Sequence, residues 1–390
     1  MMMIYEIGTG YTSIPARVGA ATEIVAEELA AALIKDGDSV AIVDIYDKKR
    51  PENELPILEV KVPKAFTKTY ATLGFKHMLK RVVYSLCLAR KLKRILKQTE
   101  EKVVLHFHNQ YNLFFFLKFT PKKLLKKATV VYTVHSYIWG AEWNKIEKII
   151  NTKYFQEIFC IKHADKVLVL NDLTAEHFVN HLGLEKTKII KVRNGVNAQK
   201  YFPISEQEIE HFKSDMGFEN KKIIFQVGSV CERKNQLGAV KMLVNFLRSN
   251  PDVCYIYAGG IMDENYQNDI IEFAKVQNIE NQVKYVGEIA PGEELNRYYN
   301  AASCSIFPSN LESFGLVVIE SISAGTPVLV GGKLMFELGG GYSIYNNEDE
   351  FILLLEKALN TDKRDSDCSK FAQDYSWDKV AKQHSNIFSK

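Results

Sequence analysis

The chain has 390 residues and a net charge of +3, from 50 Lys and Arg against 47 Asp and Glu. This length favours two domains, and 46% hydrophobic with 25% charged residues is typical of a globular protein with a large core. The charge is too small to indicate a nucleic-acid partner, and none is expected.

The sequence also argues against secretion and membrane insertion. No stretch approaches the roughly 20 apolar residues of a membrane span. The first residues lack the basic and apolar regions of a signal peptide. The six cysteines are scattered, with no zinc or redox spacing between any pair, so we expect buried reduced thiols. We therefore expect a cytoplasmic protein.

The first segments in chain order predict a doubly wound α/β domain. Residues 4–7 form an apolar strand, an alanine-rich helix ends near Lys35, and residues 40–45 form a second buried strand. Ligands bind such sheets at the carboxyl ends of the strands, where the loop at 12–20 would lie. The polar, proline-punctuated residues 48–65 carry little signal.

Residues 75–97 predict a basic amphipathic helix, with Met78, Val82, Leu86 and Leu92 among many Lys and Arg. Such a helix can lie on an anionic membrane surface. The alternative, which we favour, is that the apolar stripe packs on the sheet and the charges face solvent. Peripheral contact with the inner face of a membrane is left open.

Two further strands, at 103–108 and 130–135, each end in a histidine. His106 and His108 have no third ligand nearby in the sequence, so they make a poor metal site and we treat them as structural. Asp365 and Asp367 form a D-x-D pattern, but in a charged loop. We expect no metal ion and no cofactor.

A second strand and helix alternation begins after residue 200. The strand at 222–228 is followed by Arg233 and Lys234, and a cationic pair at a strand end can clamp a diphosphate. Because the alternation restarts after residue 200, we predict one domain at 1–200 and a second at 201–372, followed by a closing amphipathic helix at 373–390.

The most informative stretch is 309–327, SNLESFGLVVIESISAGTP, which predicts strand, loop, helix and strand. Phe314, Gly315 and Leu316 would offer free backbone N–H groups at a helix N-terminus, which is a ready anion site. Glu312 in the loop and Glu320 on the helix could each accept hydrogen bonds from sugar hydroxyls. This arrangement suits a nucleotide sugar.

The longer string P-S-x-x-E-S-F-G-L-V-x-x-E-x-x-x-x-G-x-P-V closely resembles the donor-site signature of retaining glycosyltransferases of family 4, which have the GT-B fold. The resemblance implies two Rossmann-like domains that face a cleft, an N-terminal one for the acceptor and a C-terminal one for the nucleotide sugar. The closing helix would cross back to the first domain.

The resemblance also assigns roles to single residues. Glu312 would contact the donor sugar, Glu320 would hold the ribose, and His135 would contact the donor sugar near the transferred carbon. Lys234 matches a family lysine, whereas Ser229 stands where an arginine is common, so Arg233 is our candidate for that guanidinium. The resemblance assigns the remaining candidates to donor binding (Gly228, Phe314, Gly315, Leu316) and to an acceptor-side loop (Pro15, Gly19, Ala20).

The function that follows is metal-independent, retaining transfer of a sugar from a nucleoside-diphosphate sugar to a glycan or lipid-linked glycan, in surface polysaccharide or glycoconjugate assembly. Two alternatives remain. One is a degenerate transferase that binds a sugar or nucleotide without turnover. Ser229, where the family often has arginine, and Ala20, where it often has glycine, keep this alternative open. The other is a sugar phosphorylase or epimerase on the same architecture, for which we find no phosphate or cofactor signature.

Overall fold

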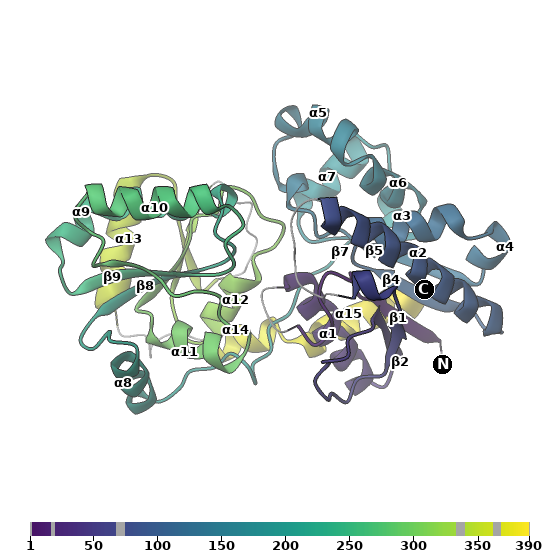
Figure 1. Cartoon of the computed structure of the whole chain (residues 1–390), viewed down its shortest axis with the longest axis horizontal. Helices are drawn as coiled ribbons and strands as arrows, with labels where there is room; N and C mark the ends of the chain where they lie inside the picture. Colours follow the sequence, from purple (N-terminus) through teal and green to yellow (C-terminus); the bar gives the residue numbers. More distant parts are fainter. Residues whose placement is uncertain (1, 17–19, 68–74, 333–339, 362–367, 390) are drawn as a thin grey trace. The chain divides into compact units, whose positions relative to one another are not determined.

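The structure is a computed structural model that describes residues 2–16, 20–67, 75–332, 340–361 and 368–389. The chain divides into two compact units. Unit 1 comprises Met1–Asn194 and Trp377–Lys390, and unit 2 comprises Gly195–Ser376. The sequence placed the change of domain near residue 200, and the structure has it after Asn194. Each unit is an α/β layer structure with helices against a parallel sheet (Figure 1).

The unit 1 sheet contains seven strands within the described residues, in the order β3-β2-β1-β4-β5-β6-β7. These strands are β1 (Met3–Ile7), β2 (Ser39–Ile45), β3 (Ile57–Val60), β4 (Val103–Phe107), β5 (Ala128–Thr133), β6 (Lys166–Val169) and β7 (Ile189–Lys191). All are paired in parallel. Strand β3 was missed from the sequence because its four residues lie in a polar segment at the sheet edge.

Helices connect these strands. They are α1 (Ala21–Lys35), α2 (Phe75–Gln98), α3 (Gln110–Phe119), α4 (Lys122–Leu125), α5 (Trp143–Lys153), α6 (Phe155–His163), α7 (Asp172–Asn180) and α15 (Trp377–Ser389), with short 3-10 turns at Lys64–Phe66, Tyr137–Gly140 and Lys186–Lys188. The turn at Tyr137–Gly140, α5 and α6 follow one another as an interrupted helical segment between β5 and β6. The asparagines before α3 and α7, Asn109 and Asn171, cap them through their side chains.

Helix α2 is the basic amphipathic helix, but of the predicted apolar stripe only Leu92 is buried, and the face that points inward is a different one. Tyr84, Leu88, Leu92 and Leu96 recur every four residues and are buried. Met78 and Leu79 near its start are exposed. None of the helices in the described residues is both long and apolar enough to cross a membrane.

The unit 2 sheet contains six strands within the described residues, in the order β10-β9-β8-β11-β12-β13. They are β8 (Lys222–Val227), β9 (Val253–Ala258), β10 (Val283–Tyr285), β11 (Cys304–Phe307), β12 (Val328–Gly331) and β13 (Tyr342–Tyr345). The helices are α8 (Glu206–Asp215), α9 (Gln236–Ser249), α10 (Glu264–Val276), α11 (Glu293–Ala301), α12 (Leu316–Ser323), α13 (Glu348–Asn360) and α14 (Cys368–Asp374), with a 3-10 turn at Glu232–Lys234.

Alternate strand residues face two separate cores in unit 2. Phe225 and Ile256 point into the core made with α11 and α12, whereas Ile224 and Tyr255 point into the core with α9, α10 and α13. Helices therefore cover both faces of this sheet (Figure 1). Such double burial explains the continuous apolar runs of its strands.

The closing helix α15 belongs to unit 1, where it packs against α1. Its inner face carries His384 and Phe388, which are 3% and 2% exposed. The Phe388 ring meets the His106 ring edge to face, with centroids 5.3 Å apart. An exposed ion pair, Lys35 to Asp378 at 2.7 Å, joins the two helices and contributes little.

Phe388→Ala is expected to lower the free energy of unfolding of unit 1 by about 3–5 kcal/mol, because it leaves a cavity beside His106. Denaturant unfolding followed by circular dichroism measures the change. Lys382→Ala, at an exposed position of the same helix, should change stability by less than about 0.5 kcal/mol. Equal effects of the two substitutions would contradict the packing described for α15.

Candidate functional site

Three charged residues meet in unit 2 at the carboxyl ends of β8 and β11. The Glu312 carboxylate accepts a 2.6 Å hydrogen bond from Arg233 Nη1 and lies 2.7 Å from Lys234 Nζ. Arg233 also donates to the Leu311 carbonyl. Because β8 and β11 are paired neighbours, the turns that follow them lie side by side. Two cations on one carboxylate leave a net charge of +1 in this cluster.

A glycine makes room for the lysine. Gly228 follows β8 with φ of +151°, and a Cβ there would lie 3.1 Å from Lys234 Cε. A side chain would therefore both strain the backbone and collide with the lysine stem. The lysine ammonium also lies over the Phe307 ring, 5.1 Å from its centroid. Burial lowers the pKa of Lys234, an effect that Glu312 opposes.

The two turns are also joined through backbone groups. Asn310 N–H donates to the Arg233 carbonyl at 2.8 Å, and the Asn235 side chain donates to the Pro308 carbonyl at 3.1 Å. Asn235 has a left-handed backbone with φ of +60°, which asparagine tolerates. These bonds hold Arg233 and Lys234 against the loop that carries Glu312.

Helix α12 begins directly after this loop. Gly315 is its N-cap residue, with φ of +88°, and no side chain caps the helix. The first N–H groups therefore have no helical partner and carry the positive end of the helix dipole. Phe314 and Leu316 are half-buried and pack on the unit 2 core, which fixes where the helix starts.

Glu320 lies one turn into α12 and is 7% exposed. The Tyr299 hydroxyl, from α11, donates to Glu320 Oε2 at 3.0 Å. This partner could not be found from the sequence, because Tyr299 lies in a helix whose pattern explains it as a core residue. Ser309, also in the motif, has a buried hydroxyl with no partner in the described protein.

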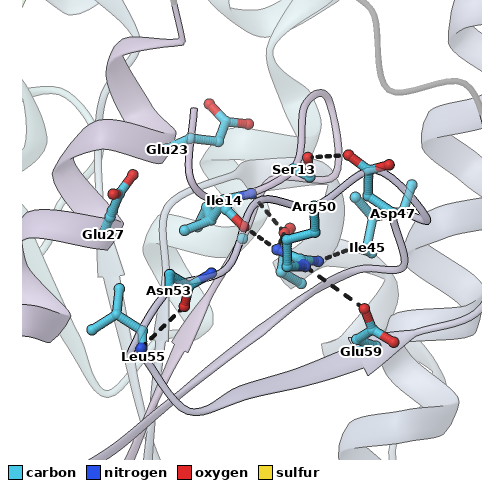
Figure 2. Close-up of polar contacts among 12 residues, drawn as sticks. Ser13, Ile14, Glu23, Glu27, Ile45, Asp47, Arg50, Asn53, Leu55 and Glu59 are labelled. Carbon is cyan, nitrogen blue, oxygen red and sulfur yellow. Dashed lines mark hydrogen bonds and ion pairs between the residues drawn. The ribbon is translucent and has the colours of Figure 1, made fainter. Parts of the chain in front are cut away.

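In unit 1 the loop after β1 is held by side chains that lie at the end of β2 and just after it (Figure 2). Asp44 accepts from Ile14 N–H at 2.8 Å, and Asp47 accepts from the Ser13 hydroxyl at 2.7 Å. Arg50 donates to the Ile14 carbonyl and lies 3.0 Å from Asp44. The loop backbone is thus fixed immediately before Pro15.

The remaining acceptor-side candidates are placed as follows. Pro15 is preceded by a cis peptide bond. Ala20 is the N-cap of α1, with its carbonyl accepting from Ile24 N–H at 3.0 Å. Gly19 lies outside the described residues, as do Asp365 and Asp367.

Two carboxyl groups are buried beneath this loop. Burial raises the pKa of Glu23 to about 7, although the Thr9 hydroxyl donates to it. Burial likewise raises the pKa of Asp44 to about 6, against the opposing effects of Ile14 N–H and Arg50. Both groups therefore change protonation close to neutral pH.

His135 follows β5 and belongs to a buried network. Its Nε2 lies 3.0 Å from His108 Nδ1, and His108 Nε2 lies 2.7 Å from Glu6 Oε2. His106 Nδ1 lies 2.8 Å from the same Glu6 oxygen, and His106 Nε2 lies 2.7 Å from the Thr133 hydroxyl. The sequence offers no third ligand-type residue close to the two histidines. The pairing of β1 with β4 supplies one, because it places Glu6 opposite His106.

Within the described residues, Glu6, His106 and His108 are the set of ligand-type groups close enough to hold a metal ion. Their spacing suits hydrogen bonds better. Metal–ligand bonds of about 2.1 Å in tetrahedral geometry hold ligand atoms about 3.4 Å apart, whereas the histidine nitrogens lie 2.7 and 2.8 Å from Glu6 Oε2. We interpret the set as a hydrogen-bond network.

The loop after His135 is anchored by Glu157 of α6, which is fully buried. Its carboxyl group accepts from the hydroxyls of Tyr132 and Ser136 at 2.8 and 2.6 Å, and from Trp139 Nε1 at 3.0 Å. Burial raises the pKa of Glu157, and these three donors oppose the shift. The carboxyl group thereby fixes the backbone on both sides of His135.

Two protein-family models match the chain. Residues 22–200 match the model described as Glycosyltransferase Family 4, and residues 207–375 match Glycosyl transferases group 1. Together the matches cover both units. The chain belongs to this glycosyltransferase family. The fold and the family inferred from the donor motif are therefore confirmed.

Individual relatives agree with this family. A UDP-Gal:alpha-D-GlcNAc-diphosphoundecaprenol alpha-1,3-galactosyltransferase of Escherichia coli is 23% identical over 234 residues, which are 58% of this chain and 56% of that enzyme. Sucrose-phosphate synthase of Thermosynechococcus elongatus superposes with a TM-score of 0.76 at 16% identity, covering 100% of this chain and 98% of its own. The Anabaena protein HepE, in a complex with UDP and glucose, superposes with a TM-score of 0.71 at 14% identity, covering 100% of both chains.

Glu23→Gln is expected to change how stability depends on pH. The pKa of Glu23 is about 7 in the folded protein and about 4.3 in an unfolded chain. Between these values only the folded state keeps the proton, so the free energy of unfolding falls as pH rises, by roughly 4 kcal/mol in all. The glutamine never ionises and should remove this fall.

Urea unfolding at pH 5 and pH 8 measures the effect. Glu23→Gln should be more stable than the wild type at pH 8 and no more stable at pH 5. Glu52→Gln, at an exposed position, should follow the wild-type curve. A wild type and Glu23→Gln that lose stability in parallel from pH 5 to pH 8 would contradict the buried, proton-holding Glu23.

Proposed function

We propose that the chain transfers a sugar from a nucleoside-diphosphate sugar to a glycan or lipid-linked glycan, with retention of anomeric configuration and without a metal ion. The observation that carries this proposal is the cluster of Arg233, Lys234 and Glu312 beside the uncapped N-terminus of α12. Fixed cations and free N–H groups together suit a diphosphate.

The chemistry follows from where charge develops. As the sugar leaves, negative charge grows on the diphosphate, and groups already fixed in place stabilise it without reorganising. The stem of Lys234 lies in the space left by Gly228, and Arg233 is held by its hydrogen bond to the Leu311 carbonyl. In the family a front-face path is usually proposed, in which the leaving phosphate takes the acceptor proton, so a separate base is not needed.

The comparisons support the substrate classes. The Anabaena protein HepE is in a complex with UDP and glucose, and the name of the E. coli relative gives UDP-Gal and a diphosphoundecaprenol-linked acceptor. We extend the donor class and the lipid-linked acceptor class to this chain. Unit 2 would bind the nucleotide sugar, with Glu320 on the ribose and Glu312 on the sugar. Unit 1 would bind the acceptor near the loop that carries Pro15, Gly19 and Ala20, and its His135 would contact the donor sugar.

Glu320→Ala is expected to weaken nucleotide binding, because a ribose hydroxyl loses its acceptor. Thermal shift with UDP, GDP and ADP should find one base that stabilises the wild type and stabilises Glu320→Ala less. Glu293→Ala, an exposed glutamate of α11, is the control and should respond like the wild type. Absence of any shift with all three nucleotides would contradict the donor site.

Glu312→Gln is expected to lower kcat by about 10²–10³, the scale for one lost transition-state contact. The amide can still accept from Arg233 and Lys234, so folding is preserved. Release of nucleoside diphosphate from the matching nucleotide sugar measures turnover, with Glu293→Gln as the control. An unchanged rate would remove Glu312 from the reaction, and nucleotide binding without any turnover in the wild type would favour the binding-module alternative.

A further inference from the structure

The hydrogen bonds that link Glu6, His108 and His135 each have a donor and an acceptor that can be assigned. An ionised carboxylate can only accept hydrogen bonds. Burial alone would raise the pKa of Glu6, but His106 and His108 lower it to about 2, so Glu6 is ionised at any ordinary pH. The two ring nitrogens that face it, His106 Nδ1 and His108 Nε2, must therefore carry protons.

The next step fixes His135. Burial lowers the pKa of His108, and so does His106, while Glu6 opposes them. A neutral His108 with its proton on Nε2 has a lone pair on Nδ1. The 3.0 Å contact with His135 can then be a hydrogen bond only if His135 Nε2 is the donor.

The state of His135 completes the chain. Burial lowers its pKa well below the usual value, and His108 and His106 lower it further. A neutral His135 with its proton on Nε2 keeps a lone pair on Nδ1. Unlike His108, which is 4% exposed, the His135 residue is only half-buried.

We propose that Glu6 and His108 are positioning residues that hold His135 in the tautomer with a protonated Nε2, so that its Nδ1 accepts a hydrogen bond from a substrate hydroxyl. His135 is then a hydrogen-bond acceptor at neutral pH, and neither an acid nor a cation for phosphate. This inference rests on the proposed function only for the identity of the substrate, a sugar hydroxyl.

Four elements of unit 1 contribute the titratable and polar groups that surround the network. Glu6 comes from β1, His106 and His108 from β4 and its end, and Thr133 from β5. The His384 ring, from α15, lies tilted beside the His106 ring at a centroid distance of 5.8 Å, and burial lowers the pKa of His384 to about 4. Glu6 is therefore the anion of this network and sets its direction.

The test begins with the intact wild-type chain. Long-range ¹H–¹⁵N correlation spectra of histidine-labelled protein report which ring nitrogen carries the proton, and His135→Gln assigns the signal of His135. We expect a neutral, Nε2-protonated ring that does not titrate between pH 6 and pH 8. An Nδ1-protonated ring, or a charged ring at pH 7, would overturn the proposal.

Two substitutions of His108 separate positioning from packing. In His108→Asn the side-chain oxygen stands near the position of Nδ1 and can still accept from His135. His108→Leu fills similar space but accepts nothing. We expect His135 to keep its tautomer in His108→Asn, and in His108→Leu to show both tautomers and to titrate closer to the usual histidine range. The same loss of signal in both variants would overturn the proposal.

Thr133→Val is the matched control, because Thr133 is equally buried and bonds to His106 but not to His135. It should leave the His135 spectrum unchanged. With the nucleotide sugar identified by thermal shift, kcat should fall by up to about 10²-fold in His108→Leu, with partial rescue in His108→Asn and little change in KM for the donor.

The outcomes distinguish the two proposals. A locked His135 in a protein without any transferase activity would leave this inference standing and contradict the proposed function. An active enzyme whose His135 tautomer and kcat are both unaffected by His108→Leu would support the proposed function and contradict this inference.

Discussion

Parallel strand pairing is the constraint on which both units depend, because it brings the carboxyl ends of neighbouring strands to one edge of a sheet. In unit 1, β1, β4 and β5 are neighbours, which puts Glu6 opposite His106 and brings His108 to His135. In unit 2, the pairing of β8 with β11 brings Lys234 to Glu312. The functional residues come from segments that are distant in sequence but adjacent in the sheet.

Burial of charged groups is a second feature of the structure, and several of the buried carboxyl groups are compensated locally. A buried carboxylate without partners would be costly. Glu6 is compensated by two histidine N–H groups, and Glu312 by Arg233 and Lys234. Glu157 instead accepts three hydrogen bonds from neutral donors. These contacts orient side chains and loops in addition to offsetting desolvation.

Glu23 and Asp44 differ, because burial dominates and raises their pKa values toward neutrality. They lie under the loop that the family resemblance assigns to the acceptor, where the backbone is held by Asp44, Asp47 and Arg50. Ionisation of Glu23 and Asp44 lowers the stability of the folded state as pH rises.

The sequence by itself determined the α/β class, the family and the residues of the donor motif, because strand and helix periodicities and the spacing from Glu312 to Glu320 are local properties. It missed the short edge strands β3 and β13, because each has only four residues and is flanked by Pro or Gly residues that are typical of loops. Only the tertiary structure decided the partners: Glu6 for His106, Tyr299 for Glu320 and Glu157 for the loop after β5. Glu6 and His106 are 100 residues apart in the chain, and what joins them is strand register, which no local pattern encodes.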